Sequence, residues 1–185
     1  ESIGDLTNLT TLNIGGNGQS TGITGSIPSS IANLTSLTQL TLSYNQLSGE
    51  IPEAIGSLVN LEGLYLYNNQ LSGVIPEFIG GMSNLKDLWL GSNQFTGNIP
   101  DFIWTLSNLT DLQLSGLNFT GEITSQVSSL INLEGLYLGG NAFTGNILPE
   151  ICNLTSLNHL NLYDNQFTGE IPECFFDLPF YTFYL

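Results

Sequence analysis

Aromatic and acidic side chains recur in this sequence at a regular spacing. Tyr65 and Trp89 occupy equivalent positions, and Asp87 and Asp111 share another. A rigid ring offers apolar area with a polar handle, and carboxylates attract basic groups, so these residues favour noncovalent recognition of a ligand. β-propensity alone would also place Tyr and Trp on a sheet. The residues predicted to bind a ligand are Tyr44, Glu62, Tyr65, Tyr67, Asp87, Trp89, Asp111, Glu134, Tyr137, His159 and Tyr163.

The same residues do not predict catalysis. His159 and Asp164 share one segment, but no Ser or Cys is placed by spacing as their nucleophile. Asp87 and Asp111 would lie about 5 Å apart on neighbouring strands, as in some glycosidases, yet any two aligned residues share that separation. Neither a Cys/His metal spacing nor an Asp-rich calcium loop occurs. We therefore predict no enzymatic activity, no metal and no cofactor.

Repeats are the elements that must position these side chains. Each unit reads L-x-x-L-x-L-x-x-N-x-[LF]-x-G-x-I-P, as in LTQLTLSYNQLSGEIP from Leu37. Leu40 and Leu42 should point inward and Thr41 outward, because side chains alternate along a strand. One unit cannot bury its leucines alone, whereas stacked units form a parallel sheet and a continuous core. The units follow one another in equal steps after a longer first step, and they begin at Leu9, Leu37, Leu61, Leu85, Leu109, Leu133 and Leu157.

Three recurring residues should shape the connections between strands. Asn45 can satisfy backbone groups at the turn, Gly49 permits backbone angles closed to other residues, and Pro52 fixes φ where a short helical turn begins. The equivalents of Asn45 are Asn17, Asn69, Asn93, Asn141 and Asn165.

The acidic residues should form one row along a margin of the sheet, with a histidine at its far end. This row consists of Glu62, Asp87, Asp111, Glu134 and His159.

A repeat of this length and pattern is identified as the leucine-rich repeat. Its L-x-G-x-I-P half resembles the plant-type repeat of receptor ectodomains, receptor-like proteins and polygalacturonase-inhibiting proteins, over about residues 3–178. The resemblance implies an α/β solenoid, a right-handed superhelix with a parallel concave β-sheet and a second short sheet beside it. We expect seven repeats and a partial eighth in one domain, residues 1–185. Because polar caps are missing, we also expect a fragment of a longer protein or end-to-end stacking.

Some units depart from the pattern. The first inserts four residues around GNGQSTG, which predicts a loop on the flank. In the fifth, Leu117 replaces the turn Asn and Thr124 replaces Pro, so the turn must find other partners and the curvature should change locally. The end, LPFYTFYL, begins a partial eighth unit with Tyr181 and Tyr184 in leucine positions.

Sequons and cysteines bear on the environment of the chain. The sequons are Asn8, Asn33, Asn108, Asn118 and Asn153. The four that read NLT are expected at one repeat position, where glycans would coat the flank and leave the concave face open. Cys152 and Cys174 lie in adjacent turns and either form a disulfide or remain two buried thiols.

Charge limits the partners. The chain of 185 residues has 16 acidic residues and a single basic one, Lys86, for a net charge of -15. Nucleic acid and anionic lipid are therefore improbable partners. No apolar run is long enough to span a membrane. With the sequons, these features favour a secreted or cell-surface protein.

Three functions remain open from sequence. The first is extracellular recognition, in which an aromatic and acidic concave face binds a protein, peptide or glycan. The second is a structural surface or wall glycoprotein whose uncapped repeats stack into an assembly. The third is ice binding through a Ser/Thr column, although its neighbouring outward column is mixed and charged. The Ser/Thr column consists of Thr24, Ser48, Ser72, Thr96, Thr120, Thr144 and Thr168.

Overall fold

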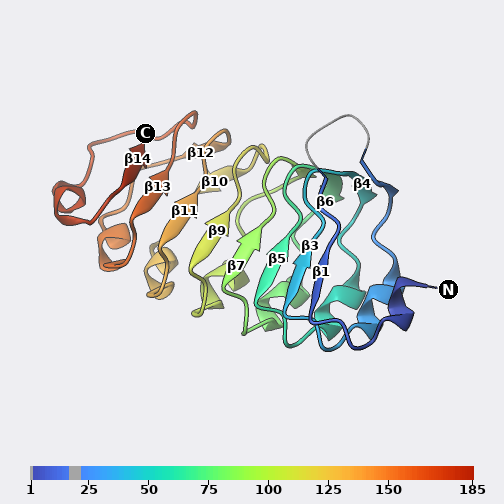
Figure 1. Ribbon diagram of the computed structural model, residues 1–185. Helices are drawn as coiled ribbons and strands as arrows, with labels where there is room; N and C mark the ends of the chain where they lie inside the picture. The colour runs from blue at the N-terminus through green and yellow to red at the C-terminus, as the bar shows by residue number, and fades with distance from the viewer. Residues whose placement is uncertain (1, 17–21) are drawn as a thin grey trace.

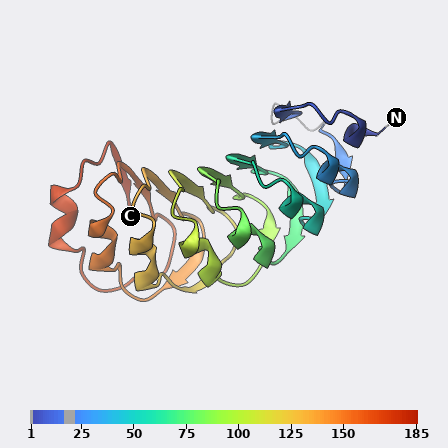
Figure 2. The same cartoon turned by 90° about the horizontal axis from the view of Figure 1, so that it is seen from below.

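The structure is a computed structural model that describes residues 2–16 and 22–185. Within these residues, eight short parallel strands stack side by side in chain order into one sheet, as Figure 1 shows. In Figure 2 the stack bends with this sheet on the inner side, and we call it the concave sheet. Its strands are β1 (Thr11–Asn13), β3 (Gln39–Thr41), β5 (Gly63–Tyr65), β7 (Asp87–Trp89), β9 (Asp111–Gln113), β11 (Gly135–Tyr137), β13 (His159–Asn161) and β14 (Thr182–Tyr184). The predicted α/β solenoid is confirmed.

The second sheet also forms, in two described parts. One part pairs β2 (Thr24–Gly25), β4 (Gln46–Gly49), β6 (Gln70–Gly73) and β8 (Gln94–Phe95). The other pairs β10 (Thr120–Glu122) with β12 (Ala142–Thr144). The interruption coincides with the fifth unit, where the repeat pattern departs. There Leu117 is buried, and its N–H donates to Asn141 Oδ1 at 3.1 Å, so the predicted replacement partner is found.

Short 3-10 helices complete each turn of the solenoid. Pro52 is the N-cap residue of η3, in extended conformation, so proline precedes the helical turn by one residue. No helix among the described residues is long and apolar enough to cross a bilayer. The helices are η1 (Ile3–Asp5), η2 (Ser29–Asn33), η3 (Glu53–Ser57), η4 (Glu77–Gly81), η5 (Asp101–Thr105), η6 (Ser125–Ser129), η7 (Pro149–Asn153) and η8 (Glu173–Asp177).

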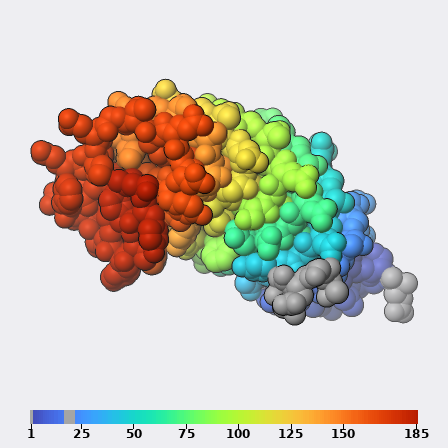
Figure 3. All heavy atoms as spheres, turned by 90° about the horizontal axis from the view of Figure 1, so that it is seen from above, coloured from blue at the N-terminus to red at the C-terminus, as the bar shows by residue number. Residues whose placement is uncertain are grey.

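The core is one apolar column that runs the length of the stack. Leu40 and Leu42 are buried as expected, and so are their equivalents in the following units. Phe119 and Phe143 pack edge to face, with ring centroids 6.5 Å apart. In Figure 3 the chain colours follow one another along the long axis, so each repeat packs mainly on its sequence neighbours. Such nearest-neighbour packing lets a long surface be built from repeated small units.

Asparagine ladders and glycines form the turns as predicted. Asn69 Nδ2 donates to Leu42 O and Leu66 O, and its Oδ1 accepts from Leu47 N, all at 3.0 Å. Gly49 has φ +83°, which L-residues rarely adopt. Asn17 and the inserted segment 17–21 lie outside the described residues.

The end of the chain differs from expectation. β14 pairs with β13 in a register that places Phe183 opposite Leu160 and Tyr184 opposite Asn161. The last step is thus one residue shorter than the steps before it, and such a slip exchanges the inward and outward sides of a strand. Phe180 and Phe183 therefore face the core and stack 5.0 Å apart, whereas Tyr181 is 81% exposed. The assignment of Tyr181 and Tyr184 to leucine positions was wrong.

The cysteines and sequons can now be placed. Cys152 in η7 and Cys174 in η8 are joined by a disulfide, with Cα atoms 6.0 Å apart.

The expectation of one shared position for the NLT sequons was wrong, because asparagine precedes a core leucine at two different points of the repeat. Two sequons end 3-10 helices, and two lie three residues before a strand. The first pair is Asn33 and Asn153, and the second is Asn8 and Asn108. All five sequon asparagines, Asn118 included, are at least partly accessible to solvent.

Candidate functional site

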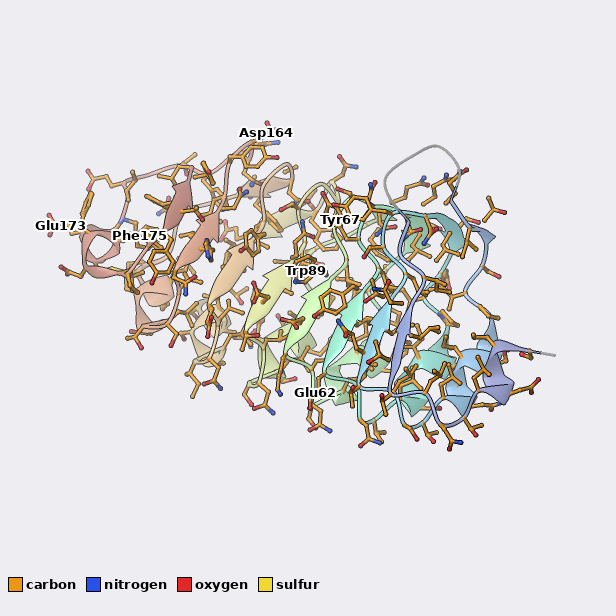
Figure 4. The ribbon with its side chains drawn as sticks, in the orientation of Figure 1. Glu62, Tyr67, Trp89, Asp164, Glu173 and Phe175 are labelled. Atoms are coloured by element: carbon orange, nitrogen blue, oxygen red, sulfur yellow. A yellow bond between two sulfur atoms is a disulfide. The ribbon has the colours of Figure 1, made fainter. Side chains whose placement is uncertain are left out.

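The outward positions of the concave sheet bring the predicted aromatic residues together. Tyr65 in β5 and Trp89 in β7 are register partners, and their rings meet edge to face with centroids 5.3 Å apart. Trp89 is 37% exposed. Figure 4 shows Trp89 in the middle of the sheet and Tyr67 nearer the strand ends. The sheet therefore presents aromatic area to solvent from a rigid backbone.

Two carboxylates lie in register beside these rings. Asp87 and Asp111 are paired residues of β7 and β9, so two like charges face each other across neighbouring strands. The Tyr65 hydroxyl donates to Asp87 Oδ2 at 2.5 Å, and Thr110 Oγ1 donates to Asp87 Oδ1 at 3.4 Å. The Asp87 carboxylate is thereby fixed in position, and the aromatic pair is tied to the acidic pair.

Glycines make room for the two tyrosine rings that flank the carboxylates. A Cβ on Gly63 would lie 2.6 Å from Tyr65 Cε2, and a Cβ on Gly135 would lie 2.7 Å from Tyr137 Cε2. Each ring therefore covers the glycine two residues before it in the same strand. Sequence reasoning missed these glycines, although the segment NLEGLYL occurs twice, at 60–66 and 132–138.

The ionisation of the site reflects dense negative charge. Burial raises the pKa of Asp111, and the charges of Asp87 and Glu134 raise it further, while His159 acts in the opposite direction. Burial and the hydrogen bond to Asp87 raise the pKa of the Tyr65 hydroxyl well above its ordinary value. Burial, followed by the charge of Asp111, raises the pKa of Tyr137. Each shift opposes further negative charge at the same place.

The predicted single acidic row is in fact two neighbouring rows. Glu62 and Glu134 lie one residue before their strands, so they align with Lys86 rather than with Asp87 and Asp111. Lys86 Nζ contacts Glu62 Oε2 at 2.7 Å, which neutralises the only lysine in the chain. In Figure 4, Glu62 lies at the lower end of the strands, apart from Trp89.

His159 and Tyr163 lie towards the C-terminal end. The His159 ring stacks on Tyr137 at 6.4 Å and lies 5.9 Å from Tyr181, and its Nδ1 is 2.7 Å from Thr182 Oγ1. Tyr163 follows β13 and lies apart from the aromatic and acidic residues of β5, β7 and β9. No group of three or more His, Cys, Asp or Glu in the described part of the chain could hold a metal ion.

A hollow of about 500 Å³ lies on the N-terminal half of the concave sheet. Tyr44 and Tyr67 stand at one side of it, with rings edge to face at 5.4 Å. Ser43 also lines it, and is only 7% exposed. Among the described residues its hydroxyl has no hydrogen-bond partner. The other lining residues are Asn13, Gly15, Gly16, Gln39, Thr41, Tyr65 and Trp89.

The Asp111→Asn variant is expected to be more stable than the wild type at pH 7. Because the folded pKa of Asp111 is raised above 3.8, the folded state binds the proton more tightly than the unfolded state. The resulting stabilisation is complete below about pH 3.8 and is lost as pH rises through the folded pKa. The amide does not titrate, so Asn removes a cost present only at higher pH.

Thermal unfolding followed by circular dichroism tests this expectation. The Tm should be higher than that of the wild type at pH 7, and the gain should disappear at about pH 3, where both side chains are uncharged. Glu53→Gln, at an exposed position in η3, removes one negative charge elsewhere and is the matched control. Equal melting of wild type and Asp111→Asn at pH 7 would show that the charge at this position costs no stability.

Comparison with known sequences matches the repeats along most of the chain. The family described as leucine rich repeat matches residues 59–119, and a description of two leucine rich repeat copies matches residues 35–80. A single-repeat description matches residues 8–34, 132–154 and 156–178. Comparison with curated proteins gives no match.

Comparison with solved structures finds plant proteins of the same architecture. The ectodomain of the membrane receptor kinase GASSHO1/SCHENGEN3 from Arabidopsis thaliana, in complex with CASPARIAN STRIP INTEGRITY FACTOR 2, is 34% identical over 94% of this chain, with a TM-score of 0.84. The Arabidopsis receptor kinase HAESA, in complex with the peptide hormone IDA and the co-receptor SERK1, is 38% identical over 91%, with a TM-score of 0.85. The chain spans only 20% and 28% of these two proteins.

A plant ice-binding protein is also similar. It is 30% identical over 98% of this chain and 65% of its own length, with a TM-score of 0.76.

Proposed function

Since the chain belongs to the leucine-rich repeat family, in its plant type, we propose that it is an extracellular recognition module that binds a peptide or protein segment on its concave sheet. The similar receptor ectodomains solved with peptide hormones support a peptide or protein partner. Their location as receptor ectodomains supports an extracellular setting. A glycan that stacks on the rings is the alternative ligand for the same face.

One observation supports this function most strongly, namely the cluster of Tyr65, Trp89, Asp87 and Asp111 on adjacent strands. These side chains point away from the core, although burying aromatic rings would stabilise the fold more than leaving them in water. Their positions are held by strand register and by the bond from Tyr65 to Asp87. A preorganised surface loses little conformational entropy on binding, which increases affinity.

The test uses a pool of random decapeptides retained on the immobilised chain at physiological salt. We expect the double variant Tyr65→Ala/Trp89→Ala to retain at least tenfold less peptide than the wild type while remaining folded. Aromatic contacts in the centre of an interface typically account for losses of about 2 kcal/mol or more. Phe176→Ala is the matched control, because Phe176 is an aromatic residue 81% exposed in η8, away from the concave sheet. Equal retention by the wild type and the double variant would reject the concave face as the binding surface.

Ice binding is a second candidate, and the similarity to a plant ice-binding protein supports it. Most of the Ser/Thr column lies on the second sheet, and its last member, Thr168, pairs with Asn146 in an isolated bridge. Thr120 Oγ1 donates to Gly97 O at 3.4 Å and Thr144 Oγ1 to Gly121 O at 3.2 Å, so these hydroxyls are ordered by the backbone. Thermal hysteresis of the purified chain would distinguish this candidate, since a peptide-binding module should show none.

A further inference from the structure

We propose that the partner is an extended peptide with a cationic side chain, arginine or lysine, which lies over Tyr65 and Trp89 against the Asp87–Asp111 pair. This inference rests on the proposed function and specifies the chemistry of its ligand. It depends on three features of the concave sheet: uncompensated charge, ordered aromatic rings and an unpartnered hydroxyl in the adjoining hollow.

Within residues 2–16 and 22–185, no lysine or arginine contacts the carboxylate pair, and His159 offsets the charge around Asp111 only in part. The sequence contains one lysine and no arginine. That lysine, Lys86, is bound to Glu62, in the one ion pair between described residues. His159 lies between Tyr137 and Tyr181, with its Nδ1 on Thr182. Asp87 and Asp111 therefore repel each other in register, and a cation supplied from outside would relieve that repulsion.

The aromatic rings extend the same preference. Tyr65 is tied to Asp87 through its hydroxyl and meets Trp89 edge to face, so ring and carboxylate are ordered together. A guanidinium or ammonium group is attracted both by the face of Trp or Tyr and by carboxylates. Neighbouring strands are about 4.8 Å apart, which places both carboxylates within reach of one planar guanidinium.

Ser43 indicates where the peptide backbone would lie. Its hydroxyl is buried, has no partner among the described residues, and lines the hollow that Tyr65 and Trp89 also line. A buried hydroxyl without a hydrogen bond is unfavourable, so a polar atom of a ligand should bond to it. A peptide group in the hollow supplies such an atom. A peptide that continues across the strands from there next passes over Trp89 towards Asp87 and Asp111.

The other ligand classes fit these features less well. A neutral sugar could stack on the rings, but it would leave the two carboxylates facing each other without a balancing charge. An acidic peptide would add repulsion to a chain whose net charge is already -15. The described residues offer no cluster of three metal-binding side chains. A cationic peptide satisfies the charge, the rings and the hydroxyl together.

The experiment compares decapeptide pools that differ at one fixed position. The fixed residue is arginine, lysine, citrulline or glutamate, and citrulline is the neutral counterpart of arginine with nearly the same shape. At physiological salt we expect the wild type to retain the arginine and lysine pools at least tenfold more than the citrulline pool. The preference should disappear in Asp87→Asn/Asp111→Asn. It should remain in Glu53→Gln/Glu77→Gln, which removes the same charge from two adjacent repeats on the helical side.

The outcomes separate this inference from the proposed function. Equal retention of the arginine and citrulline pools, with retention still dependent on Tyr65 and Trp89, would overturn the cationic ligand and leave peptide binding in place. A cation preference that persists in Asp87→Asn/Asp111→Asn would place it elsewhere and also overturn the inference. Retention independent of Tyr65 and Trp89 would overturn the proposed function itself.

Discussion

The Asn93→Ala variant is expected to lose about 3 kcal/mol or more of its free energy of unfolding. Asn93 is only 7% exposed. Its Nδ2 donates to Leu66 O at 3.0 Å and Leu90 O at 2.8 Å, and its Oδ1 accepts from Leu71 N at 2.9 Å. Leu66 O would keep its bond from Asn69 Nδ2, but alanine would leave Leu71 N and Leu90 O unpaired, and each unpaired buried group costs about 1–3 kcal/mol.

The next asparagine position along the chain cannot take over the bond to Leu90 O. In the following unit Leu117 occupies the equivalent position, and its side chain can neither donate nor accept a hydrogen bond. Denaturant unfolding measures the loss. Asn98→Ala, at an exposed position in the same repeat, is the control and should change stability by less than about 0.5 kcal/mol. If both variants unfold at the same denaturant concentration, the side-chain hydrogen bonds of Asn93 contribute no net stability.

The Gly91→Ala variant is expected to be destabilised by about 2–3 kcal/mol. Its Cβ would lie 2.5 Å from the backbone oxygen of Ser115 and would also clash with Gln113 Oε1. Ser115 O accepts a hydrogen bond from Ser92 N at 2.8 Å, so the backbone there cannot move without breaking sheet contacts. An extra methyl group at a closely packed site typically lowers the free energy of unfolding by about 1–3 kcal/mol.

Gly81→Ala is the matched control for this substitution. A Cβ on Gly81 meets no other atom within 4 Å, and the residue lies in η4. Alanine at such a site should be neutral or stabilising by up to about 1 kcal/mol, since it reduces the freedom of the unfolded chain. Thermal unfolding of the two variants compares them directly. If Gly91→Ala melts as high as Gly81→Ala, the close approach of the segments that follow β7 and β9 is not rigid.

Much of the fold could be predicted because the repeat encodes it locally. The leucine columns, the Asn45-type turns and the Gly49-type backbone angles each depend on a few residues within one unit. The same local pattern failed at the end of the chain. There a final step one residue shorter than the others turned Phe183 inward and Tyr184 outward, and no motif in the short segment marks that change.

The candidate site could be predicted only as columns of residues. Strand alternation placed Tyr65 and Trp89 on one face, but it did not show the bond from Tyr65 to Asp87 or the ring of Tyr65 over Gly63. These details depend on side-chain rotamers and on contacts between units, which a linear pattern does not specify. Glu62 was misplaced for a different reason: the repeat spacing aligns it with Lys86 and aligns Gly63 with Asp87, so it belongs to the neighbouring row.

Ser43 shows a second limit of sequence reasoning. A serine at an outward position predicts an exposed hydroxyl, yet Ser43 is only 7% exposed in the hollow that it lines with several aromatic rings. The exposed fraction of such a side chain depends on how neighbouring repeats pack, which a linear pattern does not specify. The burial of Ser43 was therefore visible only in the structure, where it points to a polar ligand atom.

Tryptophan fluorescence during titration with the arginine-fixed decapeptide pool tests the central claim most directly. The chain has two tryptophans, of which Trp89 is on the concave sheet and Trp104 is buried in the core. Binding at the proposed site should produce a saturable change in emission that is absent in Trp89→Phe and with the citrulline pool. If the pool is retained by the wild type while its emission stays constant, the ligand binds elsewhere and the account of the concave sheet is wrong.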